Sequence, residues 1–204
     1  MLILIFCFWL DVKSILILGG ISENSDPNPF GEVLNLDLTN TCNEIAIKEV
    51  SAINGAIGGL INEKPFICGG YIPSLGSYSR SCYKLNENSF ILDSTLEFNK
   101  GIGFSGYAQY KDKLLITGGV SGSLQDEEML NGIHVLTSDG FQVIGDLNYE
   151  IKDHCMVQID ENTFMLTGGK TIGGELSDEY LHKTTVLKLS ESKYYMIFCE
   201  GEII

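Results

Sequence analysis

The sequence predicts an all-β protein in which a unit of four short antiparallel strands is repeated four times along the chain. Three observations lead to this prediction. An apolar run ends in two glycines four times, the apolar runs are rich in β-branched and aromatic residues, and no segment keeps the 3.6-residue apolar period of a packed helix. The first glycines of the pairs are Gly19, Gly69, Gly118 and Gly168, so the repeat is close to 50 residues long.

The first two strands of each unit are apolar stretches on either side of a short polar turn. These turns are residues 11–13, 62–64, 111–113 and 160–162, and the stretch after each turn ends in the glycine pair. Two extended segments around a tight polar turn are typical of a β-hairpin. Because glycine has no Cβ, each pair allows unusual backbone angles and close approach between neighbouring sheets. The structural glycines are Gly19, Gly20, Gly69, Gly70, Gly118, Gly119, Gly168 and Gly169.

The last two strands of each unit follow a loop of about ten to thirteen residues after the glycine pair. The third runs are residues 33–38, 81–85, 132–137 and 184–189, and the fourth runs are 44–50, 90–96, 141–147 and 194–200. A four-stranded sheet repeated in this way packs best as blades around an axis, which is a β-propeller. We therefore expect one propeller domain over residues 1–204, with blades at about 2–50, 55–98, 102–148 and 153–200.

The first blade begins with an unbroken apolar run, residues 2–10. This run is too short to span a membrane, which takes about 20 residues. Its length suits the core of a signal peptide, although no basic residue precedes it and no small-residue cleavage site follows. The alternative is a buried first strand, which the repeat favours. Cytoplasmic and secreted locations both stay open.

The charge balance argues against several classes of partner. Thirteen lysines and arginines stand against 27 acidic residues, which gives a net charge of −14, and Arg80 is the single arginine. Proteins that bind nucleic acid need cationic side chains to displace counterions from phosphates. An anionic membrane surface is disfavoured for the same reason.

The period and the placement of the glycines resemble the kelch repeat, whose blades carry a Gly-Gly pair at the end of the second strand. The resemblance covers essentially the whole chain. Tyr83 suits the family's tyrosine in the third strand, whereas Phe90, Phe141 and Tyr194 or Tyr195 stand where the family has a tryptophan in the fourth. Kelch propellers usually have more than four blades. The resemblance therefore implies either a tightly closed ring or, as we favour, an arc of a larger propeller, with open blade faces that invite self-association.

Several motifs that suggest chemistry are better explained by the repeat. Residues 101–106 satisfy G-x-G-x-x-G, and residues 169–171 resemble the end of a phosphate loop, but neither leaves room for the helix that such sites require. His134, His154 and His182 lack the spacing of metal ligands. We therefore expect no catalytic, cofactor or metal site.

Two cysteines fall at corresponding places in neighbouring strands of the second blade. Cys68 ends the second strand and Cys82 lies in the third, so the two could face each other. Secreted kelch-like chains often have a similar CGG…C arrangement, and the resemblance thus implies a Cys68–Cys82 disulfide. Two buried free thiols are the alternative.

The loop of residues 71–80 is the best candidate for binding. It carries Tyr71, Tyr78 and Arg80, which are residue types enriched at interaction hot spots, and in kelch propellers this class of loop lines one rim of the axis. The matching acidic loop of the third blade, residues 125–128, would select a basic partner. We expect a non-catalytic module that binds another protein.

The competing hypothesis is a carbohydrate-binding protein or sugar-modifying enzyme on a related propeller, either galactose oxidase-like or sialate-isomerising. Copper radical oxidases need a Tyr–Cys crosslink with histidine and tyrosine ligands. The three scattered histidines argue against that chemistry.

Overall fold

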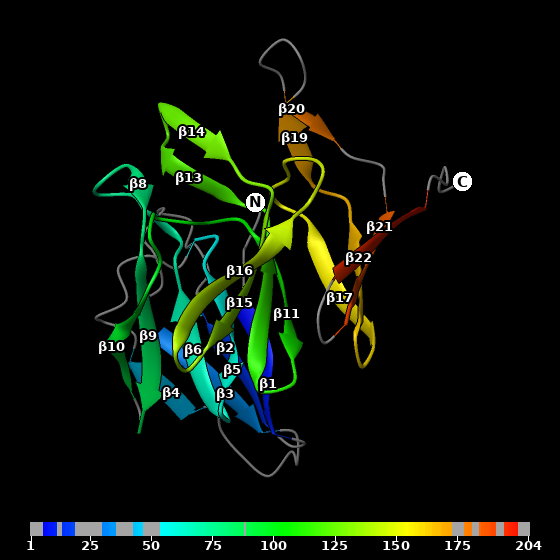
Figure 1. Ribbon diagram of the computed structural model, residues 1–204. Coiled ribbons are helices and arrows are strands. Elements are labelled where there is room, and N and C mark those ends of the chain that lie inside the picture. Colours follow the sequence, from blue (N-terminus) through cyan, green and yellow to red (C-terminus); the bar gives the residue numbers. More distant parts are fainter. Residues whose placement is uncertain are drawn as a thin grey trace.

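The computed structural model describes residues 6–11, 14–18, 30–35, 43–46, 54–87, 89–172, 178–180, 184–190 and 194–199. Every regular element in these ranges is a β-strand (Figure 1). Within the same ranges, no helix has the length and apolar character that crossing a membrane requires. The glycine pair Gly19–Gly20, His182 and most of the loop after the first glycine pair lie outside the described residues.

The first blade is an antiparallel meander of four strands. It consists of β1 (Phe6–Asp11), β2 (Ser14–Leu18), β3 (Phe30–Asn35) and β4 (Asn43–Ala46). Each strand pairs with the next one in the chain. The apolar run near the amino terminus thus contributes β1, as the repeat indicated.

The other three blades have the same topology. A single parallel bridge between Ala46 and Ser89 joins the outer strands of the first two blades. The second blade consists of β5 (Ile57–Ile61), β6 (Lys64–Cys68), β9 (Ser81–Asn86) and β10 (Ser89–Glu97). The third consists of β11 (Gly106–Tyr110), β12 (Lys113–Thr117), β15 (Gly132–Thr137) and β16 (Gly140–Asp146). The fourth consists of β17 (Cys155–Asp160), β18 (Thr163–Thr167), β21 (Thr184–Leu189) and β22 (Tyr194–Cys199).

The segments after the glycine pairs differ from the expected loops, because three of them form β-hairpins. Two of these hairpins join into one four-stranded sheet through a bridge between Ser77 and Ser123 and a hydrogen bond of 3.2 Å from the Leu124 amide to the Gly76 carbonyl. The hairpins project beyond one end of the blades (Figure 1). Their strands are β7 (Tyr71–Ile72) with β8 (Ser77–Tyr78), β13 (Val120–Ser123) with β14 (Asp126–Met129), and β19 (Lys170–Ile172) with β20 (Asp178–Tyr180).

The blades are arranged side by side through their first strands. Strand β5 contacts both β1 and β11, and β11 contacts β17. The third blade is buried on both of its faces because it lies between the second and fourth blades. Successive side chains of a strand point to opposite faces, so they join different cores. In β12, Leu114 and Ile116 join the core shared with the second blade, whereas Leu115 joins the core shared with the fourth.

The glycine pairs of the second and third blades connect each of these blades to the next. The second glycine of a pair donates its amide hydrogen to a carbonyl just before the first strand of the following blade: Gly70 to Ile102 at 2.8 Å, and Gly119 to Ile151 at 2.7 Å. A Cβ on the first glycine, Gly69 or Gly118, would overlap the same carbonyl oxygen. Positive φ angles at all four of these glycines also favour glycine.

The fourth blade lacks this contact within the described residues. A Cβ on Gly168 would meet no atom within 4 Å, and on its first strand, β17, Val157 and Ile159 are 49% and 56% exposed. Strand β5 of the second blade is, by contrast, almost wholly buried. An open face on the fourth blade fits the expected arc of a larger propeller, which stays a prediction.

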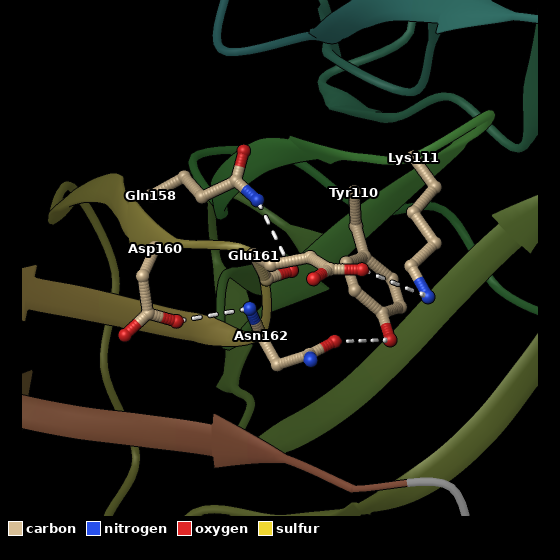
Figure 2. A network of polar contacts seen from close by, with 6 residues as sticks. All are labelled: Tyr110, Lys111, Gln158, Asp160, Glu161 and Asn162. Atoms are coloured by element: carbon tan, nitrogen blue, oxygen red, sulfur yellow. Dashed lines mark hydrogen bonds and ion pairs between the residues drawn. The ribbon is translucent and has the colours of Figure 1, made fainter.

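Polar contacts connect the hairpin turns of the third and fourth blades at the opposite end from the projecting hairpins (Figure 2). The Tyr110 hydroxyl donates to the Asn162 side-chain carbonyl at 3.2 Å, and Lys111 lies 3.9 Å from the Glu161 carboxylate. The Asn162 amide donates to Asp160 at 3.0 Å. Lys111 and Glu161 are largely exposed, so their ion pair orients the turns and adds little stability.

Replacing Gly119 by valine should destabilise the protein by roughly 3 kcal/mol, because the side chain combines a positive φ of 104° with a Cβ only 2.8 Å from the Gly103 carbonyl oxygen. Gly168→Val is the matched control. It has the same kind of backbone strain but open space, so we expect a loss of about 1.5 kcal/mol. Urea unfolding measures both, and equal losses would show that the close approach of Gly119 to the Gly103 carbonyl contributes nothing.

Candidate functional site

A pocket of about 270 Å³ lies among the projecting hairpins, where three blades meet. Its wall includes side chains from the segments that lead into the blades as well as from the hairpins. The lining residues are Asn54, Tyr71, Tyr78, Phe104, Leu124, Glu127, Lys152, Asp153 and Lys170.

A recurring backbone bridge brings these segments together. In each described repeat, the residue two positions after the first glycine pairs with the segment that leads into its own blade. The bridges are Asn54 with Tyr71, Gly103 with Val120 and Lys152 with Lys170. The residue after the bridge, Phe104 or Asp153, has a backbone φ angle in the left-handed region, and it forms a corner at which the chain turns into the first strand. The Asp153 amide donates to the Phe104 carbonyl at 2.9 Å. The repeat itself therefore places three related corners around one pocket.

The second-blade side of the pocket is aromatic. The ring centroids of Tyr71 and Tyr78 are 5.6 Å apart, and Tyr78 meets Phe104 edge-on at 6.0 Å. Tyr78 can occupy this place only because Gly101 and Gly103 lie beneath it. A Cβ on Gly101 would overlap the Tyr78 carbonyl, and one on Gly103 would come within 2.6 Å of the Tyr78 ring.

A chain of polar contacts crosses the pocket wall and joins all three blades. The Tyr78 hydroxyl donates to one carboxylate oxygen of Glu127 at 2.5 Å, and Lys152 donates to the other at 2.8 Å. Burial, followed by the bond to Glu127, raises the pKa of Tyr78 far above its usual range. Tyr78 is therefore a neutral hydrogen-bond donor at every physiological pH.

Asn54 provides an acceptor without a partner. Its side-chain carbonyl oxygen is buried and makes no hydrogen bond. A buried acceptor left unsatisfied costs about 1–3 kcal/mol, so most such atoms in folded proteins are paired. Because Asn54 lines the pocket, a turn of its side chain would present this oxygen to a ligand that donates a hydrogen bond.

The structure separates the three residues of the predicted binding loop. Tyr71 and Tyr78 line the pocket, but Arg80 does not. The Arg80 Nε donates to the Phe98 carbonyl at 2.9 Å and lies 3.5 Å from the Glu97 carboxylate. Of the acidic loop in the third blade, Glu127 faces the pocket and is paired with Lys152.

Cys68 and Cys82 form a disulfide, and both residues are buried. They face each other in the register of β6 and β9. Cys155, by contrast, is free and exposed.

The glycine-rich segment, the phosphate-loop-like segment and the described histidines all lie in or next to blade strands. Gly106 begins β11, so no helix follows the glycine-rich segment. Lys170 begins β19 and lines the pocket. His134 lies in β15, and the buried His154 lies between the third and fourth blades. Within the ranges given above, no three histidine, cysteine or acidic side chains are grouped as they would be to hold a metal ion.

Sequence reasoning missed most of the pocket. Asn54, Phe104, Lys152 and Asp153 precede first strands, and Lys170 looked like part of a phosphate-loop mimic. Their signal was positional: each lies a nearly constant distance from a glycine pair. The spacing identifies equivalent corners but gives no indication that their side chains surround one cavity.

A second, wider groove of about 550 Å³ lies at the other end of the blades, between the turns of the second and third. Its central polar residue is Gln109, whose amide group bonds to the Leu60 backbone nitrogen and oxygen and to the carbonyls of Lys111 and Lys113. These bonds hold two turns together. Gln109 therefore makes a structural contact in this groove and is not free to bind a ligand.

Comparison with known proteins identifies the fold. No protein-family profile and no curated protein matches the chain. The solved structure of YjhT, a kelch-repeat propeller, is similar with a TM-score of 0.73 and 12% sequence identity, over 95% of this chain and 68% of YjhT. The all-β fold of four antiparallel four-stranded sheets, matching propeller blades, is confirmed. At this identity the similarity shows the fold and does not extend to function.

Burial between the third and fourth blades makes His154 a determinant of acid stability. Its Nε2 lies 2.8 Å from the Thr117 hydroxyl, its Nδ1 has no partner, and burial lowers the pKa of His154 to about 4 from 6.5. As the pH falls from 6.5 to 4, the unfolded chain binds the proton before the folded chain does. The free energy of unfolding should therefore fall, by up to about 3 kcal/mol, over this window.

His154→Gln tests this prediction, since glutamine stays uncharged and can still bond to Thr117. Urea unfolding across the same pH window should show a smaller loss for the variant than for the wild type. His134, whose pKa burial also lowers, is present in both proteins and cancels. Parallel pH profiles would mean that His154 is accessible to protons in the folded state.

Proposed function

We propose that this propeller binds a small polyhydroxylated ligand of the carbohydrate class in the pocket lined by Tyr71, Tyr78, Phe104 and Asn54. The observation that carries the proposal is the combination of an aromatic wall with an unpaired buried acceptor in one cavity of about 270 Å³. Ligand pockets are mostly apolar with a few well-placed polar groups, and this one is of a size for a single small molecule.

The aromatic wall suits one face of a sugar ring. A sugar presents C–H groups on its faces and hydroxyls around its edge, so an aromatic side chain can cover the face while polar groups meet the edge. The tilted pair Tyr71–Tyr78 and the edge-on pair Tyr78–Phe104 hold these rings in fixed orientations. Rigid aromatic contacts contribute affinity with little loss of side-chain entropy.

The polar groups favour binding over catalysis. Both carboxylate oxygens of Glu127 are engaged, one by Tyr78 and one by Lys152. A general base must be within reach of the proton it removes, and a carboxylate held from both sides is poorly placed for that role. We therefore propose a binding protein rather than a sugar-modifying enzyme.

Asn54→Ala separates function from stability. Removing an unsatisfied acceptor should leave the free energy of unfolding unchanged or slightly higher, while the affinity for the ligand falls about tenfold. The measurement is calorimetric titration with a panel of methyl glycosides of neutral hexoses, an N-acetylhexosamine and a hexuronate, next to urea unfolding. If no panel member binds the wild type, the carbohydrate proposal is wrong.

Tyr71→Ala tests the aromatic wall with the same panel. We expect about a tenfold loss of affinity, because the ring contact is lost while the backbone bridge to Asn54 remains. Arg80→Ala is the matched control from the same loop and should bind as the wild type does, since Arg80 points to Phe98 and Glu97. An equal loss in both variants would contradict the pocket assignment.

A second function has an observation of its own. Leu75 and Leu124 are 70% and 60% exposed on the tips of neighbouring hairpins whose backbones are bonded to each other. Two exposed leucines side by side are typical of a protein contact. This surface supports the protein-binding module that the loop composition predicted. Leu75 does not line the pocket, so replacing it alone by serine should weaken partner recovery and leave glycoside binding unchanged.

A further inference from the structure

The Cys68–Cys82 disulfide occupies a distinctive place in the second blade. It joins the last residue of β6 to a directly opposed residue of β9, with the Cα atoms 4.1 Å apart. The same register positions hold Thr117 and Ile133 in the third blade and Thr167 and Thr184 in the fourth. Among these three blades, the second alone has this covalent link.

The disulfide closes the base of the hairpin that carries the two pocket tyrosines. The enclosed segment, residues 69–81, contains all of β7 and β8, so both ends of the hairpin leave the blade next to a bridged cysteine. Above the bridge, Gly69 donates to the Ser81 carbonyl at 3.0 Å and Ser79 to the Gly70 carbonyl at 2.7 Å. The segment therefore has a narrow neck fixed by one covalent and two hydrogen bonds.

This hairpin is in special need of a constraint. It has two paired positions, Tyr71 with Tyr78 and Ile72 with Ser77, whereas the hairpin of the third blade has four. One bridge from Ser77 to Ser123 and one hydrogen bond from Leu124 to Gly76 join it to the neighbouring hairpin, and a hairpin with so few pairs is marginal in water. The neck also includes Gly69 and Gly70, which have the most backbone freedom to lose.

We propose that the Cys68–Cys82 disulfide is a positioning device that holds the 69–81 hairpin in the orientation in which Tyr71 and Tyr78 form the pocket wall. A crosslink at the base removes most open arrangements of the enclosed segment, and a preorganised loop binds its ligand with a smaller entropic cost. The claim about hairpin order stands on the fold alone. The claim about affinity rests on the proposed function of the pocket.

Amide hydrogen exchange of the ligand-free protein tests the proposal directly. In Cys68→Ala/Cys82→Ala, exchange of the Tyr71 and Ser79 amides, which bond to Asn54 and Gly70, should become at least tenfold faster. Exchange of the Val120 and Leu130 amides at the matching neck of the third blade should change less than twofold. Uniform acceleration in both blades, or none in either, would overturn the proposal.

Two further variants distinguish the effect of losing the disulfide from that of a general loss of stability. Cys68→Thr/Cys82→Ile installs the pair found in the third blade and keeps the site filled if the alanine variant folds poorly. Leu187→Ala creates a cavity in the core of the fourth blade and should lower the unfolding temperature without selective exchange at Tyr71 and Ser79. Selective exchange in Leu187→Ala would mean that the hairpin merely reports global stability.

Affinity for the glycoside that binds the wild type is the second measurement. We expect about a tenfold loss in both cysteine variants and less than a twofold change in Leu187→Ala. Faster exchange with unchanged affinity would refute the role in binding. If no glycoside binds the wild type, the proposed function fails, and the exchange result still decides whether the disulfide orders the hairpin.

Discussion

The amide-to-carbonyl contacts from Gly70 and Gly119 to the next blade are the constraint on which the arrangement of the second, third and fourth blades depends. Gly70 bonds to Ile102 and Gly119 to Ile151, and the preceding glycines lie so close that a Cβ would strike the same oxygen. A backbone contact at this distance fixes how far one sheet sits from the next and where the following strand must begin. The side chains of the two cores then pack into a gap whose width the backbone has already set.

The pocket follows from the same junctions. The chain that has just made the glycine contact turns back and bridges to the segment leading into its own blade, as at Tyr71 with Asn54 and Val120 with Gly103. Three such corners side by side must surround a space. The side chains at these corners are free to vary from blade to blade, because the bridges use backbone atoms only. This separation between a fixed frame and variable loops is what allows one fold to carry different sites.

The sequence allowed the frame to be predicted but gave little information about the site. Alternating apolar runs and the 50-residue period of the glycines identified every blade strand, because those patterns reflect local pleating and one repeated contact. The hairpins after the glycines were missed, since segments such as Asp126–Met129 are too polar and short to indicate a strand without a neighbour. The contact of Glu127 with Tyr78 and Lys152 joins residues 49 and 25 positions apart, and no local pattern predicts it.

His154 and Asn54 each have a buried side-chain atom without a hydrogen-bond partner, but only one of the two indicates a ligand-binding site. The unpaired Nδ1 of His154 is enclosed between blades: a Cβ on Gly106 would strike its ring, and its other nitrogen meets Thr117. No hydrogen-bond partner reaches that atom, so its cost is one of packing. The unpaired oxygen of Asn54 carries a similar cost, but the residue itself lines a cavity beside three aromatic rings. Its cost can be recovered when a donor enters, and this difference makes Asn54, and not His154, the residue that points to a ligand.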